Sequence, residues 1–504
     1  MRGSRGNAED AGPASRLAQD AMIPRSLAID VGSSSVRTGL VDARGRVTHV
    51  SQRALDVTRA RPGEVELDAE QIAHHVLELA HDTLSAGGAA DAIGITNQRA
   101  TTVVFDASTG RPVGPALSWQ DLRTVLDCLT LQATGLRLAP NQSATKAAHL
   151  IRESGVPPER ARVATLDTWI TWRLTGGRSF VTDFSNAAVT GLVGPPDYTW
   201  DATVLEQLGL RREQLATIVS SVDHHGTVDA LGGLPITALL GDQPASLLGQ
   251  CLVDRGAKIT FGTGAMLDLV GGVTAPTAMV RYPSGCFPVV VRSQDGQLTW
   301  GVEGIVLSAG AALDGLRDGL GLFAHVSEVE ALAGSVATSQ GVWFVPASVG
   351  LGTPFWDFGA RSGFFGLTQG TTRAHLVRAV LEGIAHRGAD LVEAAEVETG
   401  EAISEVRVDG GMSANAVFLQ ALADALGRPV EVGKEREATT RGIGLLALVG
   451  AGAVRLAEIG QLWHPDRRIE PRMDEATRVE QRATWRWALD QVRRTIPELS
   501  EIDF

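Results

Sequence analysis

The chain has 504 residues, which is enough for two to four domains at roughly 100–200 residues per domain. Hydrophobic residues make up 44% and charged residues 20%, a balance typical of a globular protein and not of a disordered chain. The formal net charge of −13 excludes a general nucleic-acid binder, because such a protein needs a basic face to neutralise phosphates.

Cysteine usage and hydropathy indicate the compartment. Cys128, Cys251 and Cys286 have neither metal-ligand spacing nor the density of a disulfide framework, which favours a reduced, cytoplasmic setting. The longest apolar run, Gly442–Val454, is shorter than the roughly 20 residues that a membrane-spanning helix needs. Residues 1–24 contain no apolar segment of the kind found in signal peptides, and we expect a flexible tail there.

The first half of the chain begins with three short apolar segments separated by Gly-containing turns, at 26–30, 36–42 and 47–55. This spacing predicts an antiparallel meander. A helix is expected over 68–85, because Ile72, Val76 and Leu79 recur on one face. A buried strand at 91–98 and a hairpin around 101–112 follow, and then helices near 124–131, 145–154 and 201–208.

A second strand–turn–strand segment, AKITFGTGAMLDLVGG, begins about 230 residues after the first, and the two hairpins suggest two related halves. Helices near 373–393, 413–426 and from 440 onward complete the second half. The predicted division is therefore a tail at 1–24, an N-terminal domain at 25–251 and a C-terminal domain at 252–504.

Two turns are candidate phosphate sites. In DVGSSSVR, residues 30–37, Asp30 ends a strand and three serines follow a glycine. Backbone amides and hydroxyls in such a turn can bind phosphate while the carboxylate holds a hydrated Mg²⁺, although an ordinary hairpin has the same pattern. The second candidate is the Gly-Thr-Gly turn at 262–264.

Other segments point to a nucleotide and to a base. In VDGGMSAN, residues 408–415, a strand ends in Gly-Gly and a helix opens, which presents amides to an anionic ligand. Neither a Walker A loop nor a Rossmann fingerprint is present. Asp242 follows the apolar strand Ile236–Leu240, a position from which a carboxylate commonly points into a cleft. It is the candidate general base, and a helix N-cap is the simpler alternative.

Together these motifs resemble the FGGY carbohydrate kinases, and within that family most closely the glycerol kinases. The resemblance extends over about residues 26–475. It rests on the block Gly94–Thr124, on NQSATKAAHL, and on SGFFGLTQGTTRAHLVRAVLEG at 362–383. GDQPASLLGQ, FVPASVGLGTPFWDFGAR and VRVDGGMSAN follow in the family's order.

The resemblance implies two RNase-H-like α/β domains of the actin-like ATPase class, with ATP and a small polyol or sugar in the cleft between them. Asp30 is implied to serve Mg²⁺ and Asp242 to act as the base that also contacts the substrate. The remaining residues that match the family's nucleotide positions are Ser33, Ser34, Ser35, Arg37, Thr263, Gly310, Asp314, Gly411 and Asn415. Those that match its substrate positions are Arg99, Ala100, Trp119, Asn141, Gln243 and Met266.

Several of these positions depart from the glycerol kinase pattern. Ala100 stands where that pattern has Glu, Asn141 where it has Tyr, and Met266 where it has Phe. Asp314 replaces a Gln, and Ser33 replaces a Thr but keeps the hydroxyl. Loss of a carboxylate that accepts a substrate hydroxyl predicts weaker glycerol binding, and the smaller side chains leave room for an acceptor of four or five carbons.

Three functions remain to be compared. The retained Asp30, Asp242 and glycine turns favour a kinase over a non-catalytic regulatory relative. The Arg99–Trp119 block argues against an actin-like or chaperone-like ATPase. The expected partners are ATP, Mg²⁺ and a small polyol or sugar, with no nucleic acid and no membrane. Homo-oligomerisation, regulation and the identity of the acceptor stay open.

Overall fold

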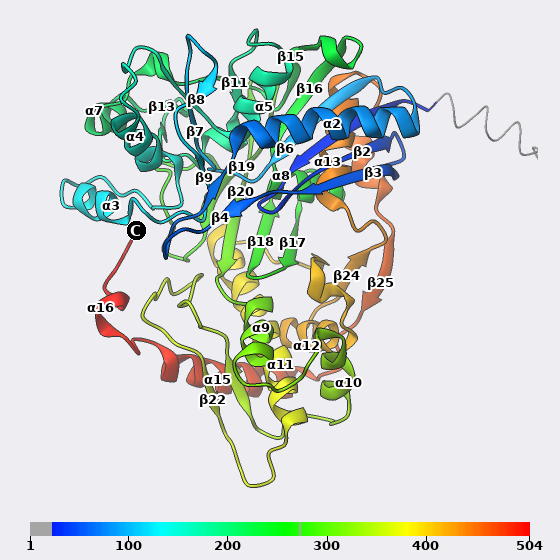
Figure 1. Cartoon of the computed structure of the whole chain (residues 1–504). Helices are drawn as coiled ribbons and strands as arrows, with labels where there is room; N and C mark the ends of the chain where they lie inside the picture. Colours follow the sequence, from blue (N-terminus) through cyan, green and yellow to red (C-terminus); the bar gives the residue numbers. More distant parts are fainter. Residues whose placement is uncertain (1–22, 272–273) are drawn as a thin grey trace, which may run out of the picture.

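The computed structural model describes residues 23–271 and 274–504, so the predicted tail at 1–24 lies almost wholly outside the described residues. Figure 1 shows two lobes, each built around a mixed sheet. The sheet of the first lobe has six strands, in the order β15 (Val222–Val228), β16 (Leu234–Gly241), β6 (Ala92–Asn97), β1 (Arg25–Val31), β2 (Ser35–Asp42) and β3 (Val47–Ala54). Strands β1 to β3 form the predicted antiparallel meander, and β6 runs parallel to β1 and β16.

The second lobe repeats this arrangement. Its seven strands run in the order β19 (Phe287–Gln294), β20 (Gln297–Val306), β18 (Ala265–Val270), β17 (Gly256–Phe261), β23 (Val406–Asp409), β24 (Val430–Gly433) and β25 (Pro465–Ile469). Strands β17, β18 and β20 form an antiparallel meander, and β23 and β24 continue parallel to β17. Because β3-β2-β1-β6-β16 and β20-β18-β17-β23-β24 have the same order and directions, the prediction of two related halves is confirmed.

Short strands link the outer loops of both lobes. In the first lobe these are β4 (Val57–Thr58), β5 (Glu66–Leu67), β7 (Val103–Asp106), β8 (Arg111–Pro112), β9 (Ala116–Leu117), β10 (Ala161–Ala164), β11 (Val181–Asp183), β12 (Val193–Gly194), β13 (Thr199–Trp200) and β14 (Thr217–Val219). In the second lobe they are β21 (Trp343–Val345) and β22 (Gly363–Phe365). Strands β7 and β8 form the hairpin predicted around 101–112.

The predicted helices are present, with ends shifted by a few residues. Helix α2 (Ala69–Gly87) begins after Asp68, whose carboxylate accepts hydrogen bonds from the amides of Glu70 and Gln71. The other helices of the first lobe are α3 (Val125–Gln132), α4 (Ser143–Ser154), α5 (Leu166–Leu174), α6 (Phe184–Ala187), α7 (Ala202–Leu208) and α8 (Asp242–Gly249). Those that follow are α9 (Gly310–Asp318), α10 (Val329–Gly334), α11 (Arg373–Thr399), α12 (Ala416–Leu426), α13 (Ala438–Gly450), α14 (Leu456–Ile459), α15 (Glu475–Val492) and α16 (Pro497–Ser500).

Helix α13 comes late in the chain but packs on the sheet of the first lobe. In Figure 1 it lies among the strands of that lobe, and its buried face shares a core with α8 and with β1, β6 and β16. The contact with α8 is very close, because a Cβ atom on Gly249 would collide with the carbonyl oxygen of Ala438. The Thr237 hydroxyl donates to the Ala447 carbonyl at 2.8 Å and fixes the helix along β16. The two halves of the chain are therefore packed together at the helix that begins with Asp242.

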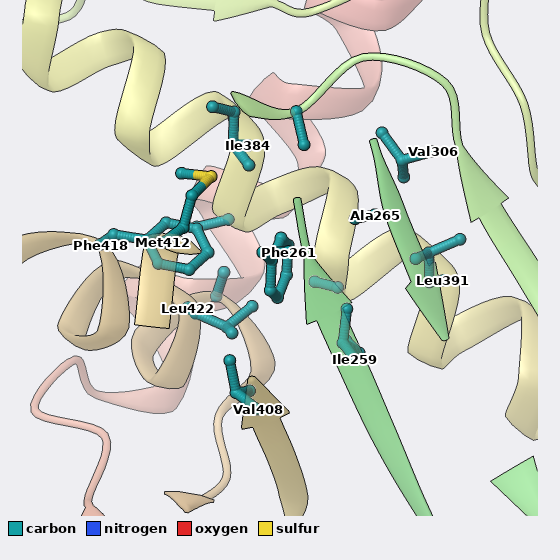
Figure 2. Packing of buried hydrophobic residues seen from close by; sticks show 14 of the residues in the cluster. Ile259, Phe261, Ala265, Val306, Ile384, Leu391, Val408, Met412, Phe418 and Leu422 are labelled. Carbon is teal, nitrogen blue, oxygen red and sulfur yellow. The ribbon is translucent and has the colours of Figure 1, made fainter. Parts of the chain in front are cut away.

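The core of the second lobe lies between its sheet and helices α11 and α12. Figure 2 shows Phe261 at its centre, against Phe418, Leu422 and Ile384. The rings of Phe261 and Phe418 meet edge to face with centroids 4.8 Å apart, a favourable aromatic geometry. Phe261 is the last residue of β17, so this core anchors the strand that leads into the Gly-Thr-Gly turn.

Helix α15 has one face buried against the second lobe. Trp487 is half exposed, but Trp485 and Arg482 are buried, and Trp485 stacks on His386 of α11. The helix therefore carries part of the core of the second lobe. Within residues 23–271 and 274–504, no helix is both long and apolar enough to cross a membrane.

Candidate active site

A cavity of about 280 Å³ lies between the two lobes, at the ends of β6 and β16 and beside β18, β19 and β20. A larger hollow of about 840 Å³ lies beside α2 and β8, but it contains none of the predicted site residues. The inter-lobe cavity collects eight of them: Ser33, Arg99, Ala100, Trp119, Asn141, Asp242, Gln243 and Met266.

Asp242 is placed by the junction of β16 and α8. The Gly241 amide donates to the Ser185 hydroxyl at 2.8 Å, and that hydroxyl donates to the buried Asp183 carboxylate at 2.9 Å. The N-cap of α8 is Gly241, and among the described residues the Asp242 carboxylate accepts one hydrogen bond, from the adjacent Gln243 amide at 2.9 Å. The N-cap alternative for Asp242 is therefore wrong, and its carboxylate is directed into the cavity.

Arg99 lies between two carboxylates that come from different lobes. Its Nε is 3.5 Å from Oδ1 of Asp242, and its Nη2 is ion-paired with Glu303 on β20. Burial raises the pKa of Asp242, and the Arg99 charge opposes that rise. Burial likewise raises the pKa of Glu303. The cavity thus contains two carboxylates whose pKa values are raised, which makes each a better proton acceptor than an ordinary carboxylate.

A buried lysine fixes the second polar residue of α8. The Lys258 ammonium lies 2.9 Å from Oδ2 of Asp268 and donates to Oε1 of Gln243 at 2.8 Å. Both Lys258 and Asp268 are excluded from solvent. Gln243 also lines the cavity, and because its carbonyl oxygen accepts from Lys258, its amide nitrogen is the group of this side chain that can donate to a ligand.

The remaining wall of the cavity combines polar and apolar groups. The indole Nε1 of Trp119 donates to the Ser33 hydroxyl at 3.1 Å. The turn at residues 30–37 is therefore in contact with the segment Gly94–Thr124. Ala100 has a positive φ of 60°, and its carbonyl accepts from Ser143 at 3.2 Å. Asn141 and Met266 line the same cavity. At these positions the wall offers an amide and two short or flexible side chains.

The Gly-Thr-Gly turn is closed by the start of α9. The Gly310 amide donates to the Gly262 carbonyl at 2.9 Å, and the Ala311 amide donates to the Thr263 carbonyl at 3.0 Å. A Cβ on Gly310 would lie 2.6 Å from the Gly262 carbonyl oxygen, so only glycine permits this approach. The Thr263 side chain itself remains exposed and free to meet a phosphate.

The predicted nucleotide residues of the later segments lie near the end of β23. Gly410 has a φ of 85°, and a Cβ there would collide with the Phe261 carbonyl, next to the Gly-Thr-Gly turn. Gly411 faces open space, and Asn415 caps α12 by accepting from the Phe418 amide at 2.9 Å. Asp314, on α9, is half exposed and ion-paired with Arg317 at 3.1 Å.

Asp30 is the penultimate residue of β1, beside the first turn, and has few partners among the described residues. The Thr440 hydroxyl is 3.4 Å from its carboxylate, and Arg37, whose main partner is Glu437, is 3.7 Å away. Burial raises the pKa of Asp30 to about 7, with a smaller opposing contribution from Arg37 and a further rise from Asp242. A buried, poorly compensated carboxylate near a second one fits a divalent cation that prefers oxygen ligands. Ser34 and Ser35 complete this turn, and Ser34 is exposed.

Glu303 is the charged residue of the cavity that the sequence did not lead us to predict. The sequence feature that could have indicated Glu303 is a carboxylate within an otherwise apolar strand. Lys258 on β17 and Asp268 on β18 are likewise charged residues within apolar strands. Charged residues are rarely buried unless they are paired. Their pairing depends on the strand register, which sets Asp268 opposite Glu303 and Lys258 opposite Asp268.

Comparison with known proteins matches both halves of the chain. Residues 26–249 match the N-terminal domain of the FGGY family of carbohydrate kinases, and residues 257–451 match its C-terminal domain. A glycerol kinase of Dechloromonas aromatica is 39% identical over 92% of this chain and 97% of its own length. The structure of Plasmodium falciparum glycerol kinase with ADP superposes with a TM-score of 0.85 at 27% identity, over 96% of this chain and 99% of that one. A xylulose kinase from Lactobacillus acidophilus shares the fold, with a TM-score of 0.83 at 21% identity over 93% and 98% of the two chains.

The fold is thus the two-domain actin-like α/β architecture that the sequence predicted. The chain belongs to the FGGY family of carbohydrate kinases. Within that family it is a glycerol-kinase-like, ATP-dependent phosphotransferase, as predicted.

Proposed function

We propose that this kinase transfers the γ-phosphoryl group of Mg²⁺-bound ATP to a hydroxyl of a four- or five-carbon polyol or ketose. The observation that supports this acceptor is the cavity wall formed by Ala100, Asn141 and Met266, which has no aromatic side chain at these positions. A longer acceptor has more hydroxyls to satisfy the Asn141 amide and the Gln243 amide nitrogen.

Asp242 is assigned as the general base. Its carboxylate lines the cavity and does not serve as the N-cap of α8, which is Gly241. Its raised pKa favours acceptance of a hydroxyl proton. Phosphoryl transfer places little other covalent demand on the protein, so positioning and charge stabilisation account for most of the remaining catalysis. Arg99 orients the Asp242 carboxylate from 3.5 Å.

The two turns and the end of β23 are assigned to the nucleotide. Ser33, Ser34, Ser35 and Thr263 supply hydroxyls and amides for phosphates, and the exposed Gly411 leaves space for a ligand. Gly310 permits the close approach of α9 to the Gly-Thr-Gly turn, and Asn415 and Asp314 are assigned to the adenosine side. Asp30 is assigned to hold Mg²⁺, which neutralises developing charge on the β- and γ-phosphates when bound.

Glycerol is the second candidate acceptor. The observation in its favour is that curated relatives at 38–39% identity over more than nine-tenths of the chain are glycerol kinases. The test is kcat/KM for glycerol against erythritol, ribulose and xylulose in an ADP-release assay. If glycerol exceeds every longer acceptor by tenfold or more, the proposal for a longer acceptor fails and glycerol takes its place.

A further inference from the structure

Glu303 is a carboxylate of the C-terminal lobe that faces the acceptor cavity formed mainly by the N-terminal lobe. It lies on β20, its side chain is 9% exposed, and it is ion-paired with Arg99 from the opposite lobe. The structural reason for its position is the β18–β20 register, which sets it directly opposite Asp268. The apolar neighbours Val302 and Val306 of the same strand are buried in the lobe's core.

The two carboxylates on Arg99 have different surroundings. Asp242 also accepts the Gln243 amide, whereas Arg99 is the one hydrogen-bond donor that Glu303 has among the described residues. A carboxylate offers about four acceptor positions, and the ion pair with Arg99 fills only part of them. Glu303, which lines the cavity, therefore keeps acceptor capacity there.

Apart from Asp242, the described residues of the first lobe that line the cavity have no acidic side chain. Ala100, the neighbour of Arg99 in the chain, presents only a methyl group, and its carbonyl is already bound by Ser143. Of the other predicted acceptor contacts, Trp119 has an indole N–H that donates to Ser33, and the side-chain oxygen of Gln243 already accepts from Lys258. An acceptor with vicinal hydroxyls needs protein groups that accept hydrogen bonds from its hydroxyls as well as groups that donate hydrogen bonds to its oxygens.

We propose that Glu303 binds the acceptor, accepting a hydrogen bond from one hydroxyl of the polyol or ketose while Arg99 donates a hydrogen bond to the oxygen of a neighbouring hydroxyl. This assignment rests on the proposed function, since it names a specificity-determining residue of that same site. Because Arg99 and Glu303 belong to different lobes, one diol contacts both and its binding favours the closed cleft. Acceptor specificity is then shared between the two halves of the chain.

The test is the variant Glu303→Gln, which keeps the shape and one oxygen acceptor but removes the charge. Loss of a hydrogen bond to a charged group should raise the KM for the acceptor about 10- to 100-fold. The KM for ATP and the dissociation constant for ADP should change less than about threefold, because the nucleotide groups lie on other turns. A structural role alone would alter both substrates or the fold, so this split between the two KM values is the decisive measurement.

A matched control is Glu396→Gln, since Glu396 is also ion-paired with an arginine, Arg428, but lies outside the cavity. It should leave the acceptor KM unchanged. An unchanged acceptor KM in Glu303→Gln, or an equal rise in Glu396→Gln, overturns the proposal. If Glu303→Gln does not fold, the variant Glu303→Asp is tested instead. It keeps the negative charge but shortens the side chain by one methylene. That variant should still raise the acceptor KM several-fold with ADP affinity retained, and no rise overturns the proposal.

The wild-type protein is assayed in the same series with glycerol and with the longer acceptors. If it phosphorylates none of them, the proposed function fails before Glu303 is considered. If it phosphorylates one of them and the Glu303 variants leave the KM of that acceptor unaltered, only the role of Glu303 is rejected.

Discussion

Replacing Asp242 by Asn removes the proposed base and leaves most of its contacts in place. In the wild-type protein Oδ1 of Asp242 accepts the Gln243 amide at 2.9 Å and lies 3.5 Å from Nε of Arg99. The side-chain oxygen of Asn can make the same two contacts. Arg99 keeps Glu303 as a charged partner, so the substitution does not leave a buried cation alone. The fold and the affinity for ADP should therefore be close to those of the wild-type protein.

The loss should appear in kcat. A positioned general base contributes about 10²- to 10⁴-fold, which corresponds to roughly 2.7–5.5 kcal/mol in the activation barrier. The KM for the acceptor should change much less, because an amide keeps the size of the side chain and one hydrogen bond. The measurement is steady-state ADP release with a saturating acceptor, together with calorimetric binding of ADP.

The result that would refute this reasoning is a variant with more than about a tenth of the wild-type kcat and unchanged ADP binding. Such activity would remove Asp242 from the role of base. A lost ADP affinity would instead show that Asp242 supports the nucleotide site, which the geometry does not predict.

Three further predictions follow from the same structure. Thr263→Ala should raise the KM for ATP about tenfold by removing a hydroxyl from the phosphate turn, with the acceptor KM unchanged in the same assay. Gly249→Ala should destabilise the protein by roughly 1–3 kcal/mol, because the added Cβ collides with the Ala438 carbonyl between α8 and α13. Asp30→Asn should be more stable than the wild-type protein above pH 7, because ionising a carboxyl whose pKa is raised from 3.8 to about 7 costs up to about 4 kcal/mol. That advantage should shrink as the pH falls toward 5, where the wild-type carboxyl is protonated.

Each of these predictions has its own control. A rise in the acceptor KM alone would show that Thr263 serves the other substrate. Gly315→Ala, on α9 with no atom within 4 Å of the added Cβ, should be neutral or slightly stabilising in the same denaturant series. The prediction for Asp30→Asn is checked by thermal unfolding of the variant and the wild-type protein at pH 8 and pH 5, without nucleotide or Mg²⁺. Lower stability of the variant at pH 8 would contradict a buried, uncompensated Asp30.

The helix from Ala438 to Gly450 shows where sequence order misleads. A Gly-rich helix was predicted from residue 440 onward, and one is present from Ala438 to Gly450. Its position in the chain assigned it to the C-terminal half, but it packs on the first sheet and on α8. Small residues permit close helix approach, yet they do not specify the partner surface. The partner is set by the whole arrangement of two sheets, which periodicity along a single segment does not contain.

By itself the sequence determined the family, the two related halves, the two glycine turns and the position of Asp242 after an apolar strand, because each depends on residues close together in the chain. Only the tertiary structure showed that Glu303 and Arg99 meet across the cleft, that Lys258 occupies the oxygen of Gln243, and that Trp119 touches Ser33. These contacts join residues up to 204 positions apart. They depend on strand register and on the packing of one lobe against the other, which local propensity does not encode.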